Sequence, residues 1–299
     1  MKILLLGAQG QLGRELCHWL KEAGEVRACG RGDLDLTENA QIEEVVNSFE
    51  PDVIVNSAAY TAVDKAESDH ELAFEVNTNA VRNIAYEAAK RDILLVHYST
   101  DYVFDGTKTQ AYHETDVTCP INIYGESKLE GEKAIIASGC RHLIFRTTWV
   151  IGKYGHNFAK TILRLASERD SLGIIGDQHG VPTSPTLISR VTLDAIKNEV
   201  HSSRWTSGIY NLIPHGKTTW FGIAKKLVEI AEDAGLTLSV DSKTINAITT
   251  DKYPTPAKRP ANSLLNNNKL QQQLSFDLPN WEEDFTVVAK DIIEELKTA

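Results

Sequence analysis

The sequence predicts an α/β fold, a doubly wound parallel sheet of the Rossmann type with a smaller C-terminal lobe. Short apolar runs alternate with helical patterns through the first half, the first run ends in a glycine-rich turn, and the second half is less regular. Alternating strands and helices form right-handed βαβ units, so helices cover both faces of a parallel sheet. The carboxyl ends of the strands then meet at one edge, where such sheets bind ligands.

The first strand is expected over Met1–Leu6, because an unbroken apolar run is typical of a strand buried on both faces. In the helix that follows, Leu12, Leu16, Trp19 and Leu20 share one face. The same patterns predict further strands at Glu25–Cys29, Asp52–Asn56, Ile93–Ser99 and His142–Thr147. They predict helices at Gln11–Ala23, Glu38–Phe49, Asn79–Lys90 and Tyr124–Ser138.

Gly7, Gly10 and Gly13 occupy the turn between the first strand and the first helix. Glycines allow a tight turn, a close approach of the backbone to a pyrophosphate, and close packing of helix on strand. The helix N-terminus adds free N–H groups and the positive end of a dipole. The spacing is Gly-x-x-Gly-x-x-Gly, and three glycines can also form an ordinary tight turn. The strand–turn–helix setting favours a dinucleotide site.

The second half predicts fewer regular elements. Its strands are expected at Leu172–Gly176 and Gly208–Leu212, and its helices at Asn157–Glu168, Leu187–Val200, Trp220–Asp233 and Trp281–Leu296, with a polar helix start in 266–273. We expect residues 1–148 to form a dinucleotide-binding domain whose sheet is completed by part of residues 187–212. Residues 149–299 are expected to form most of a substrate-binding lobe, interleaved with that sheet.

The composition limits the partners of the chain. A net charge of −10 argues against a broad nucleic-acid surface, which needs a basic stripe. No apolar stretch is long enough to span a bilayer, and the short apolar N-terminal run is not a signal peptide. The four scattered cysteines form neither a disulfide framework nor a zinc site. We expect a cytoplasmic protein with reduced thiols that binds neither nucleic acid nor membrane.

Tyr124 and Lys128 lie four residues apart in a predicted helix, so they share a face. A phenol has a pKa of about 10, too high for efficient proton exchange at neutral pH. A nearby ammonium group lowers that pKa, and the hydroxyl of Thr100, at the end of a predicted strand, could orient the phenol. This spacing alone also fits a solvated helix face. Together with the glycine turn it predicts an acid–base site.

The end of the second strand faces the adenosine ribose of a bound dinucleotide. An acidic residue there repels a 2′-phosphate, whereas Gly30 and Arg31 favour one. NADPH is therefore the expected cofactor and NADH the alternative, in which Arg31 is solvated and Asp33 or Asp35 makes the polar contact.

Three other places in the sequence bear on the site, and two of them leave alternatives open. The small side chains of Ser57, Ala58 and Ala59 let a cofactor pass close to the backbone. Asn77 fits a site residue or a helix cap equally well. Trp149 follows a strand end and fits a core residue or a ligand platform.

Together, these motifs resemble an extended short-chain dehydrogenase/reductase and, more narrowly, the dTDP-4-dehydrorhamnose reductase family. The resemblance covers essentially the whole chain. It rests on the glycine turn and on the segments 56–67, 97–104, 124–128, 145–149, 157–160, 177–183 and 258–263.

The resemblance implies reduction of the 4-keto group of dTDP-4-dehydrorhamnose to dTDP-L-rhamnose, a precursor of surface polysaccharides such as lipopolysaccharide O antigen. Tyr124 would donate the proton to the sugar O4, Lys128 would hold the nicotinamide ribose, and Thr100 would complete the triad. The implied cofactor contacts are Gly7, Gln9, Gly10, Gln11, Leu12, Gly13, Arg31, Asp35, Leu36, Ala58, Ala59, Tyr60, Tyr98, Tyr124 and Lys128. The implied substrate contacts are Thr61, Val63, Thr100, Asp101, Trp149 and Arg259, the last as a diphosphate ligand or a solvated surface residue.

Some relatives dimerise around a magnesium ion held by acidic side chains. Glu15 matches one of these positions, but Thr186 stands at a second. The sequence therefore does not support Mg²⁺, and both a monomer and a homodimer stay open. Two functional alternatives also remain: a reductase that makes another dTDP-6-deoxysugar epimer, and a non-catalytic NADP-binding regulatory subunit.

Overall fold

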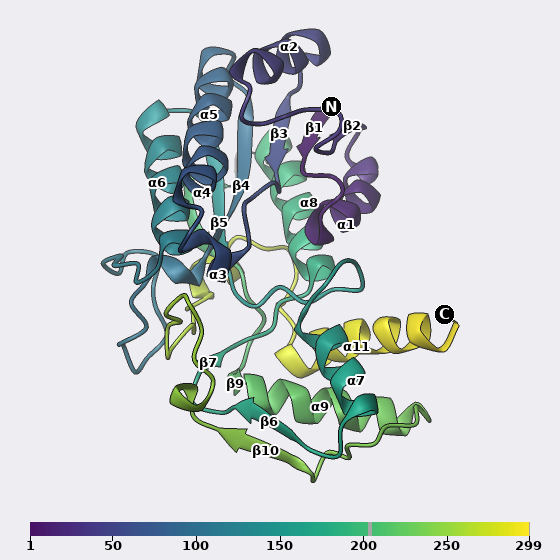
Figure 1. Ribbon diagram of the computed structural model, residues 1–299. Coiled ribbons are helices and arrows are strands. Elements are labelled where there is room, and N and C mark those ends of the chain that lie inside the picture. Colours follow the sequence, from purple (N-terminus) through teal and green to yellow (C-terminus); the bar gives the residue numbers. More distant parts are fainter. Residues whose placement is uncertain (203–204, 299) are drawn as a thin grey trace.

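The computed structural model describes residues 1–202 and 205–298 (Figure 1). Residues 203–204 and 299, which fall within the segments expected to complete the sheet and the lobe, lie outside the described residues. Within the described part of the chain, a six-stranded parallel sheet has the order β2-β1-β3-β4-β5-β8. Its strands are β1 (Lys2–Leu6), β2 (Glu25–Cys29), β3 (Val53–Asn56), β4 (Leu94–Thr100), β5 (His142–Thr147) and β8 (Gly208–Asn211). The predicted fold class is confirmed.

Helices cover both faces of the sheet (Figure 1). On β1, Ile3 and Leu5 pack in a cluster with side chains of α1 and α8, whereas Leu4 and Leu6 pack with those of α2 and α5. Each apolar side chain buried this way contributes about 1.5–3 kcal/mol. The helices are α1 (Gln11–Trp19) with the 3₁₀ turn η1 (Leu20–Glu22), α2 (Asn39–Phe49), α5 (Ala80–Lys90), α6 (Ile123–Ser138) and α8 (Pro185–Ser202).

The lobe lies below the sheet in Figure 1 and has its own apolar cluster. It contains α7 (Phe158–Glu168), α9 (Trp220–Asp233) and α11 (Trp281–Thr298), together with the parallel pair β6 (Leu172–Ile175) and β10 (Ile245–Ile248). The two-residue strands β7 (His179–Gly180) and β9 (Thr218–Thr219) pair with each other in antiparallel orientation. The short strands β7, β9 and β10 were not predicted, because so few residues carry no periodic signal.

Residues 60–79 form short helices that the sequence did not reveal: α3 (Val63–Ala66), α4 (His70–Phe74) and the π-helix η2 (Glu75–Asn79). Asn77 lies inside this π-helix and is not a cap. Its buried side chain accepts from Tyr60 N at 2.9 Å and donates to Tyr60 O at 3.0 Å and to Ser127 Oγ at 3.0 Å. The remaining short elements are η3 (Asp101–Val103), η4 (Thr250–Lys252) and α10 (Asn268–Gln271).

The strand order reverses between β1 and β3, and ligands bind at such a switch point in doubly wound sheets. Ser57, just after β3, donates from its backbone and side chain to Leu6 O at the end of β1. No helix of the described residues has the length and apolarity to cross a bilayer.

Candidate functional site

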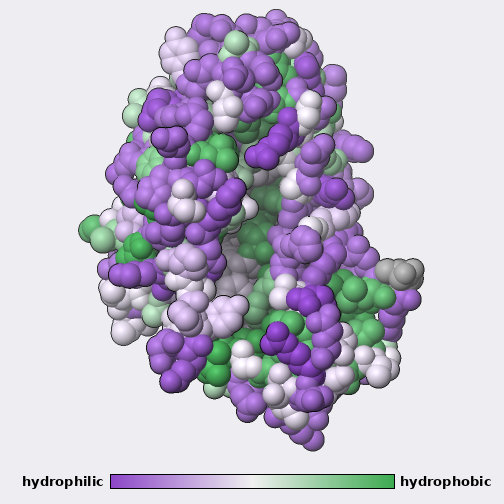
Figure 2. All heavy atoms as spheres, viewed as in Figure 1, coloured by the Kyte–Doolittle hydropathy of each residue, from purple (hydrophilic) through white to green (hydrophobic). Residues whose placement is uncertain are grey.

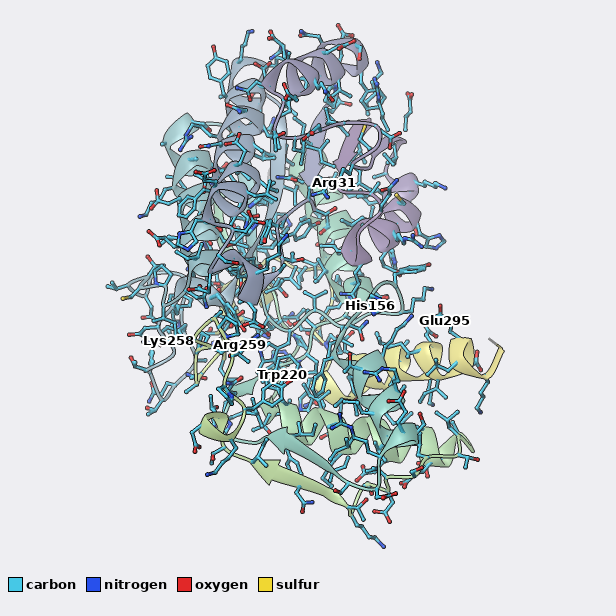
Figure 3. The ribbon with its side chains drawn as sticks, in the orientation of Figure 1. Arg31, His156, Trp220, Lys258, Arg259 and Glu295 are labelled. Atoms are coloured by element: carbon cyan, nitrogen blue, oxygen red, sulfur yellow. The ribbon has the colours of Figure 1, made fainter. Side chains whose placement is uncertain are left out.

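A cavity of about 1280 Å³ lies at the carboxyl edge of the sheet, facing the lobe. It opens into a groove with an apolar floor that runs down the face shown in Figure 2. Sites for one small molecule usually measure roughly 300–1,000 Å³. The cavity therefore has room for a dinucleotide and a second ligand. Arg31 lies toward its upper end, and Trp220 and Arg259 lie toward its lower end (Figure 3).

Most of the residues singled out in the sequence line this cavity. They are Gly7, Gln9, Gly10, Gln11, Leu12, Arg31, Asp35, Leu36, Ala58, Ala59, Thr61, Val63, Tyr98, Thr100, Asp101, Tyr124, Lys128, Trp149 and Arg259.

Gly13 and Tyr60 are not among the lining residues. Gly13 serves packing instead, because a Cβ there would lie 2.1 Å from Gly7 O. The buried Tyr60 directs its hydroxyl to Asp69 Oδ2 at 3.1 Å. Tyr98 lines the cavity, but its ring packs in the core and its hydroxyl bonds Thr192 Oγ1 at 2.8 Å.

The glycine turn forms a cradle suited to a pyrophosphate. Gly7 has φ of +78°, and a Cβ there would lie 2.6 Å from Ala58 N, so glycine is required. Among the described residues, no side chain caps α1 and no acidic residue lies in its first turn. The N–H groups at this helix end therefore remain available to an anion. The residues present fit the dinucleotide expected from the sequence.

At the end of β2, the two carboxylates considered as ribose ligands are engaged locally. Asp33 Oδ2 accepts from Gly30 N at 2.8 Å, and Asp35 Oδ1 accepts from Thr37 N at 3.0 Å and Thr37 Oγ1 at 2.8 Å. The hydrogen bonds from Thr37 lower the pKa of Asp35. Arg31 is exposed at the cavity rim. This arrangement favours recognition of a 2′-phosphate by Arg31.

Tyr124 lies in the first turn of α6, whose N-cap Asn122 accepts from Gly125 N at 2.8 Å. The expected lowering of the Tyr124 pKa is absent in this structure. Loss of hydration raises the pKa well above its usual value, the charge of Asp101 adds to this, and a hydrogen bond with the Thr100 hydroxyl opposes it. The phenol is therefore fully protonated at neutral pH.

Lys128 is buried in the middle of α6 and makes its close contacts away from Tyr124. Its Nζ donates to Tyr98 O at 2.6 Å and lies 3.1 Å from His97 Nε2. Burial lowers the pKa of Lys128 to about 8, and the charge of Glu132 counteracts part of that effect. The ammonium is thus much more acidic than an exposed lysine.

Asp101 is a buried carboxyl group beside the phenol. Its Oδ1 accepts from Thr100 Oγ1 at 3.1 Å. Burial raises the pKa of Asp101 to about 7, and hydrogen bonds from Ser263 and Thr100 work against that rise. Burial thus brings the pKa of Asp101 into the neutral range, so the site contains a second group besides Tyr124 that can carry a proton.

The lower end of the cavity is aromatic and cationic. Trp149, strained at φ of +43°, stacks on Trp220 with ring centroids 4.0 Å apart. Trp149 is thus packed on the lobe and also lines the cavity, so it combines the two roles expected from the sequence, core residue and ligand platform. Arg259 lines the cavity, and its Nη2 pairs with Asp64 Oδ2 at 2.8 Å. It is therefore not a freely solvated residue.

Glu15 lies outside the cavity lining and is already engaged. Its Oε1 accepts from Thr186 Oγ1 at 3.1 Å and from Trp19 Nε1 at 3.3 Å. In the described part of the chain, no group of three or more His, Cys, Asp or Glu side chains could hold a metal ion.

Sequence reasoning missed several residues of the site. His97 and Asn56 form a buried network with Lys128, and His156, Phe158 and Trp220 line the cavity. His97 is a polar residue inside an otherwise apolar strand, Asn56 ends such a strand, and both lie in segments that carry the family resemblance. Phe158 also lies in such a segment, 157–160, whereas no local pattern marks His156 and Trp220.

The chain matches the family model described as RmlD substrate binding domain over residues 1–294. It is 44% identical over 306 residues to a dTDP-4-dehydrorhamnose reductase of Escherichia coli K12, covering 100% of this chain and 99% of the relative. A dTDP-4-dehydrorhamnose reductase from Clostridium acetobutylicum superposes with a TM-score of 0.89 at 34% identity, over 99% of this chain and all of that one.

A further solved structure, the dTDP-4-dehydrorhamnose reductase of Bacillus anthracis in complex with NADP, has a TM-score of 0.86 at 34% identity. The match covers 96% of this chain and 98% of that chain. The agreement of the family model, the sequence relatives and the solved structures over nearly the full length leaves one assignment: this chain belongs to the family of the RmlD substrate binding domain.

Proposed function

We propose that the chain is an NADPH-dependent reductase that converts dTDP-4-dehydrorhamnose to dTDP-L-rhamnose. One observation carries the proposal: Tyr124, a protonated phenol, lines the same cavity as an uncapped helix N-terminus that fits a pyrophosphate. The names of the relatives and the NADP complex of a family member support the substrate and the cofactor.

The residues proposed to hold the cofactor follow the cavity from the glycine turn to α6. Backbone N–H groups at Gln11 and Leu12 would bind the pyrophosphate, and Arg31 would bind a 2′-phosphate. Lys128 would donate to the nicotinamide ribose. A reduced nicotinamide supplies, when bound, the hydride for the sugar C4.

Tyr124 is proposed as the proton donor to the sugar O4. A ketone that gains a hydride becomes an alkoxide, a base far stronger than a phenolate, so even a phenol of raised pKa protonates it readily. The Thr100 hydroxyl would orient the Tyr124 hydroxyl, and a charged Lys128 nearby would stabilise the phenolate that remains. The sugar nucleotide would contact Thr61, Val63, Thr100, Asp101, Trp149 and Arg259, where the positive charge of Arg259 suits a diphosphate.

We also propose the division into a dinucleotide-binding domain, residues 1–148 with part of 187–212, and a substrate-binding lobe in most of 149–299. The cavity lies where the two would meet, and it takes lining residues from both. A cytoplasmic location and a role in lipopolysaccharide or O-antigen synthesis are parts of the same proposal. This location and this role are inferred from the proposed use of NADPH and of a nucleotide-linked sugar.

The test supplies dTDP-4-dehydro-L-rhamnose with NADPH or NADH, follows oxidation of the cofactor, and identifies the product by its configuration at C4. We expect dTDP-L-rhamnose and faster turnover with NADPH. A product with the opposite C4 configuration would support the alternative of another 6-deoxysugar epimer. Cofactor binding without turnover would support the non-catalytic alternative.

The Tyr124→Phe variant tests whether Tyr124 is the proton donor. We expect an unchanged NADPH dissociation constant and a turnover lowered by roughly 10²–10⁴-fold, as for loss of a general acid. Tyr210→Phe is the matched control, because Tyr210 is buried in β8 and, among the described residues, its hydroxyl bonds Thr206 O and Thr206 Oγ1. Full activity of Tyr124→Phe would exclude the proposed proton donor.

A further inference from the structure

His97 is a fully buried histidine in β4 that lies between Asn56 and Lys128. Its Nδ1 is 3.2 Å from Asn56 Nδ2, and its Nε2 is 3.1 Å from Lys128 Nζ. The effect of this buried imidazole on Lys128 depends on which ring nitrogen carries the proton.

The backbone of Ala58 determines the tautomer of His97 through Asn56. Its N–H, which can only donate, lies 3.1 Å from Asn56 Oδ1 and so fixes the orientation of the Asn56 amide. The amide nitrogen of Asn56 then points at His97 Nδ1 and donates to it. A neutral imidazole that accepts at Nδ1 carries its proton at Nε2. His97 therefore presents an N–H group to Lys128.

An ammonium group has three donors and no acceptor, so a charged Lys128 would set two donors against each other at 3.1 Å. An uncharged amine resolves the conflict. Its lone pair accepts from His97 Nε2–H, while one of its own hydrogens goes to Tyr98 O at 2.6 Å. The geometry thus favours the uncharged form of Lys128 when the site holds no ligand.

We propose that His97 is a positioning residue that favours the uncharged form of Lys128 until the dinucleotide binds, so that in mildly alkaline solution cofactor binding is coupled to the uptake of a proton at Lys128. This inference rests on the proposed function, which places the cofactor ribose beside Lys128. The proton passes from the solvent buffer to Nζ, and His97 keeps its own. The ammonium group would then donate to the ribose hydroxyls of the bound cofactor in place of its contact with His97 Nε2, and its charge would stabilise the Tyr124 phenolate.

The charged and titratable groups around Lys128 agree with this coupling. Tyr124 and Glu132 lie on its own helix, and Arg146 on β5 donates to Glu132 Oε1 at 2.9 Å and Oε2 at 2.6 Å. That ion pair limits the effect of Glu132 on Lys128. Asp101 lies on η3, next to Tyr124. Burial holds the pKa of His97 well below its usual value, so the ring itself is neutral.

The π-helix η2 also packs on α6. Its charged residue is Glu75, whose Oε2 accepts from Asn79 Nδ2 at 2.7 Å. Glu67, just after α3, accepts from Ile123 N at the start of α6 at 2.9 Å. The other contacts of η2 with α6 are uncharged. Asn77 Nδ2 donates to Ser127 Oγ at 3.0 Å, and Thr78 Oγ1 donates to Ser127 O at 2.8 Å.

Nitrogen NMR of the cofactor-free protein, labelled with ¹⁵N-histidine, tests the tautomer directly. We expect one neutral histidine with its proton at Nε2 that does not titrate between about pH 5 and pH 9, and whose signals disappear in His97→Gln. His142 is an internal reference of the opposite kind, because its Nδ1 faces Cys140 O at 2.8 Å and must carry the proton. A His97 signal with the proton at Nδ1, or a charged ring, would overturn the proposal.

Calorimetric titration with NADPH at pH 8.5, in buffers of different ionisation enthalpy, measures the proton uptake. The wild-type protein should take up roughly half a proton or more, since Lys128 is mostly uncharged at this pH. In Asn56→Asp the carboxylate would accept from His97 Nδ1–H, leaving Nε2 to accept from a charged Lys128. His97→Gln offers the lysine a carbonyl oxygen. Both variants should lower the uptake at least twofold, and His142→Gln should not.

Equal uptake in all four proteins, or none in the wild type, would refute the coupling. Because Asn56→Asp buries a charge and can impair folding, His97→Gln decides the result if that variant unfolds. Failure of the proposed function gives a different pattern. A protein that takes up the proton with NADPH but does not reduce dTDP-4-dehydrorhamnose contradicts the proposed substrate and leaves the proposed cofactor and the proton coupling intact. A protein that does not bind NADPH contradicts the proposed cofactor. The NMR measurement then still tests the His97 tautomer, because it is made on the cofactor-free protein.

Discussion

Trp149, two residues beyond β5, stacks on Trp220, the first residue of α9, with ring centroids 4.0 Å apart and planes inclined by 24°. Trp220 also packs on Phe158, with centroids 4.6 Å apart. Figure 3 shows Trp220 at the point where the lobe reaches the cavity. Trp149, at the edge of the sheet, thus packs directly on Trp220 of the lobe. The orientation of each ring in the cavity depends on the other.

Trp220→Ala should therefore weaken binding of the sugar nucleotide more than binding of the cofactor. An aromatic pair contributes about 0.5–1.5 kcal/mol beyond its buried area, which corresponds to a roughly 2–12-fold rise in KM for the sugar nucleotide. The NADPH dissociation constant, measured by fluorescence titration, should stay within about twofold. Trp220→Phe should recover most of the affinity. Equal losses for both ligands would contradict a role at the substrate end.

Arg31→Ala should reduce the preference for NADPH. A hydrogen bond to a charged group contributes about 1.5–3 kcal/mol, so kcat/KM for NADPH should fall roughly 10–150-fold while that for NADH stays nearly constant. Arg27→Ala is the matched control on β2, just before Arg31 in the sequence, since Arg27 donates to Ser48 Oγ at 3.0 Å and its guanidinium lies over Phe49. Equal losses with both cofactors would show that Arg31 does not read the 2′-phosphate.

Asp101 should make the folded state less stable as the pH rises toward neutrality. Its folded pKa of about 7 lies above the ordinary value of 3.8, because burial disfavours the carboxylate. Between these two values the folded state keeps a proton that the unfolded state releases. Its contribution therefore falls with rising pH by on the order of 1 kcal/mol per unit.

Urea unfolding of Asp101→Asn and the wild type between pH 4 and pH 7 measures this effect. The variant should gain stability relative to the wild type as the pH rises. Asp105→Asn is a control that should show almost no pH dependence in this range. Hydrogen bonds from Thr107 and Tyr112 hold the pKa of Asp105 below its ordinary value of 3.8, so the folded and unfolded states both carry the carboxylate over most of this range. A pH-independent difference for Asp101→Asn would mean that the carboxyl group is ionised throughout.

Gln11 should couple energetically to Asn157, with which it forms a direct hydrogen bond. Gln11 Oε1 accepts from Asn157 Nδ2 at 3.0 Å and from Gly152 N at 2.8 Å, and Nε2 donates to Val150 O at 3.2 Å. These bonds tie the glycine turn to the loop that precedes α7. A double-mutant cycle of Gln11→Ala and Asn157→Ser should give a coupling free energy of about 0.5–1.5 kcal/mol.

Serine is the appropriate replacement at position 157. Asn157 caps α7 by accepting from Lys160 N at 3.1 Å, and serine keeps that cap while removing the amide donor. Additive effects of the two changes on the free energy of unfolding would show that the contact contributes nothing.

Much of the fold followed from local chemistry. The apolar run before Gly7 predicted β1 to within one residue, because a strand buried on both faces leaves no polar position. The helix carrying Tyr124 and Lys128 began one residue earlier than expected, at Ile123. The π-helix around Asn77 could not be read in this way, because it is stabilised by contacts with Tyr60 and Ser127, far away in the sequence.

The sequence by itself determined the glycine turn and the four-residue spacing of Tyr124 and Lys128, because each depends on spacing within one segment. Only the tertiary structure decided what surrounds that pair. His97, Asn56 and Asp101 change its proton affinities through burial and hydrogen bonds between neighbouring strands and turns. Burial and the direction of a hydrogen bond are properties of packed segments, and no spacing along one segment encodes them.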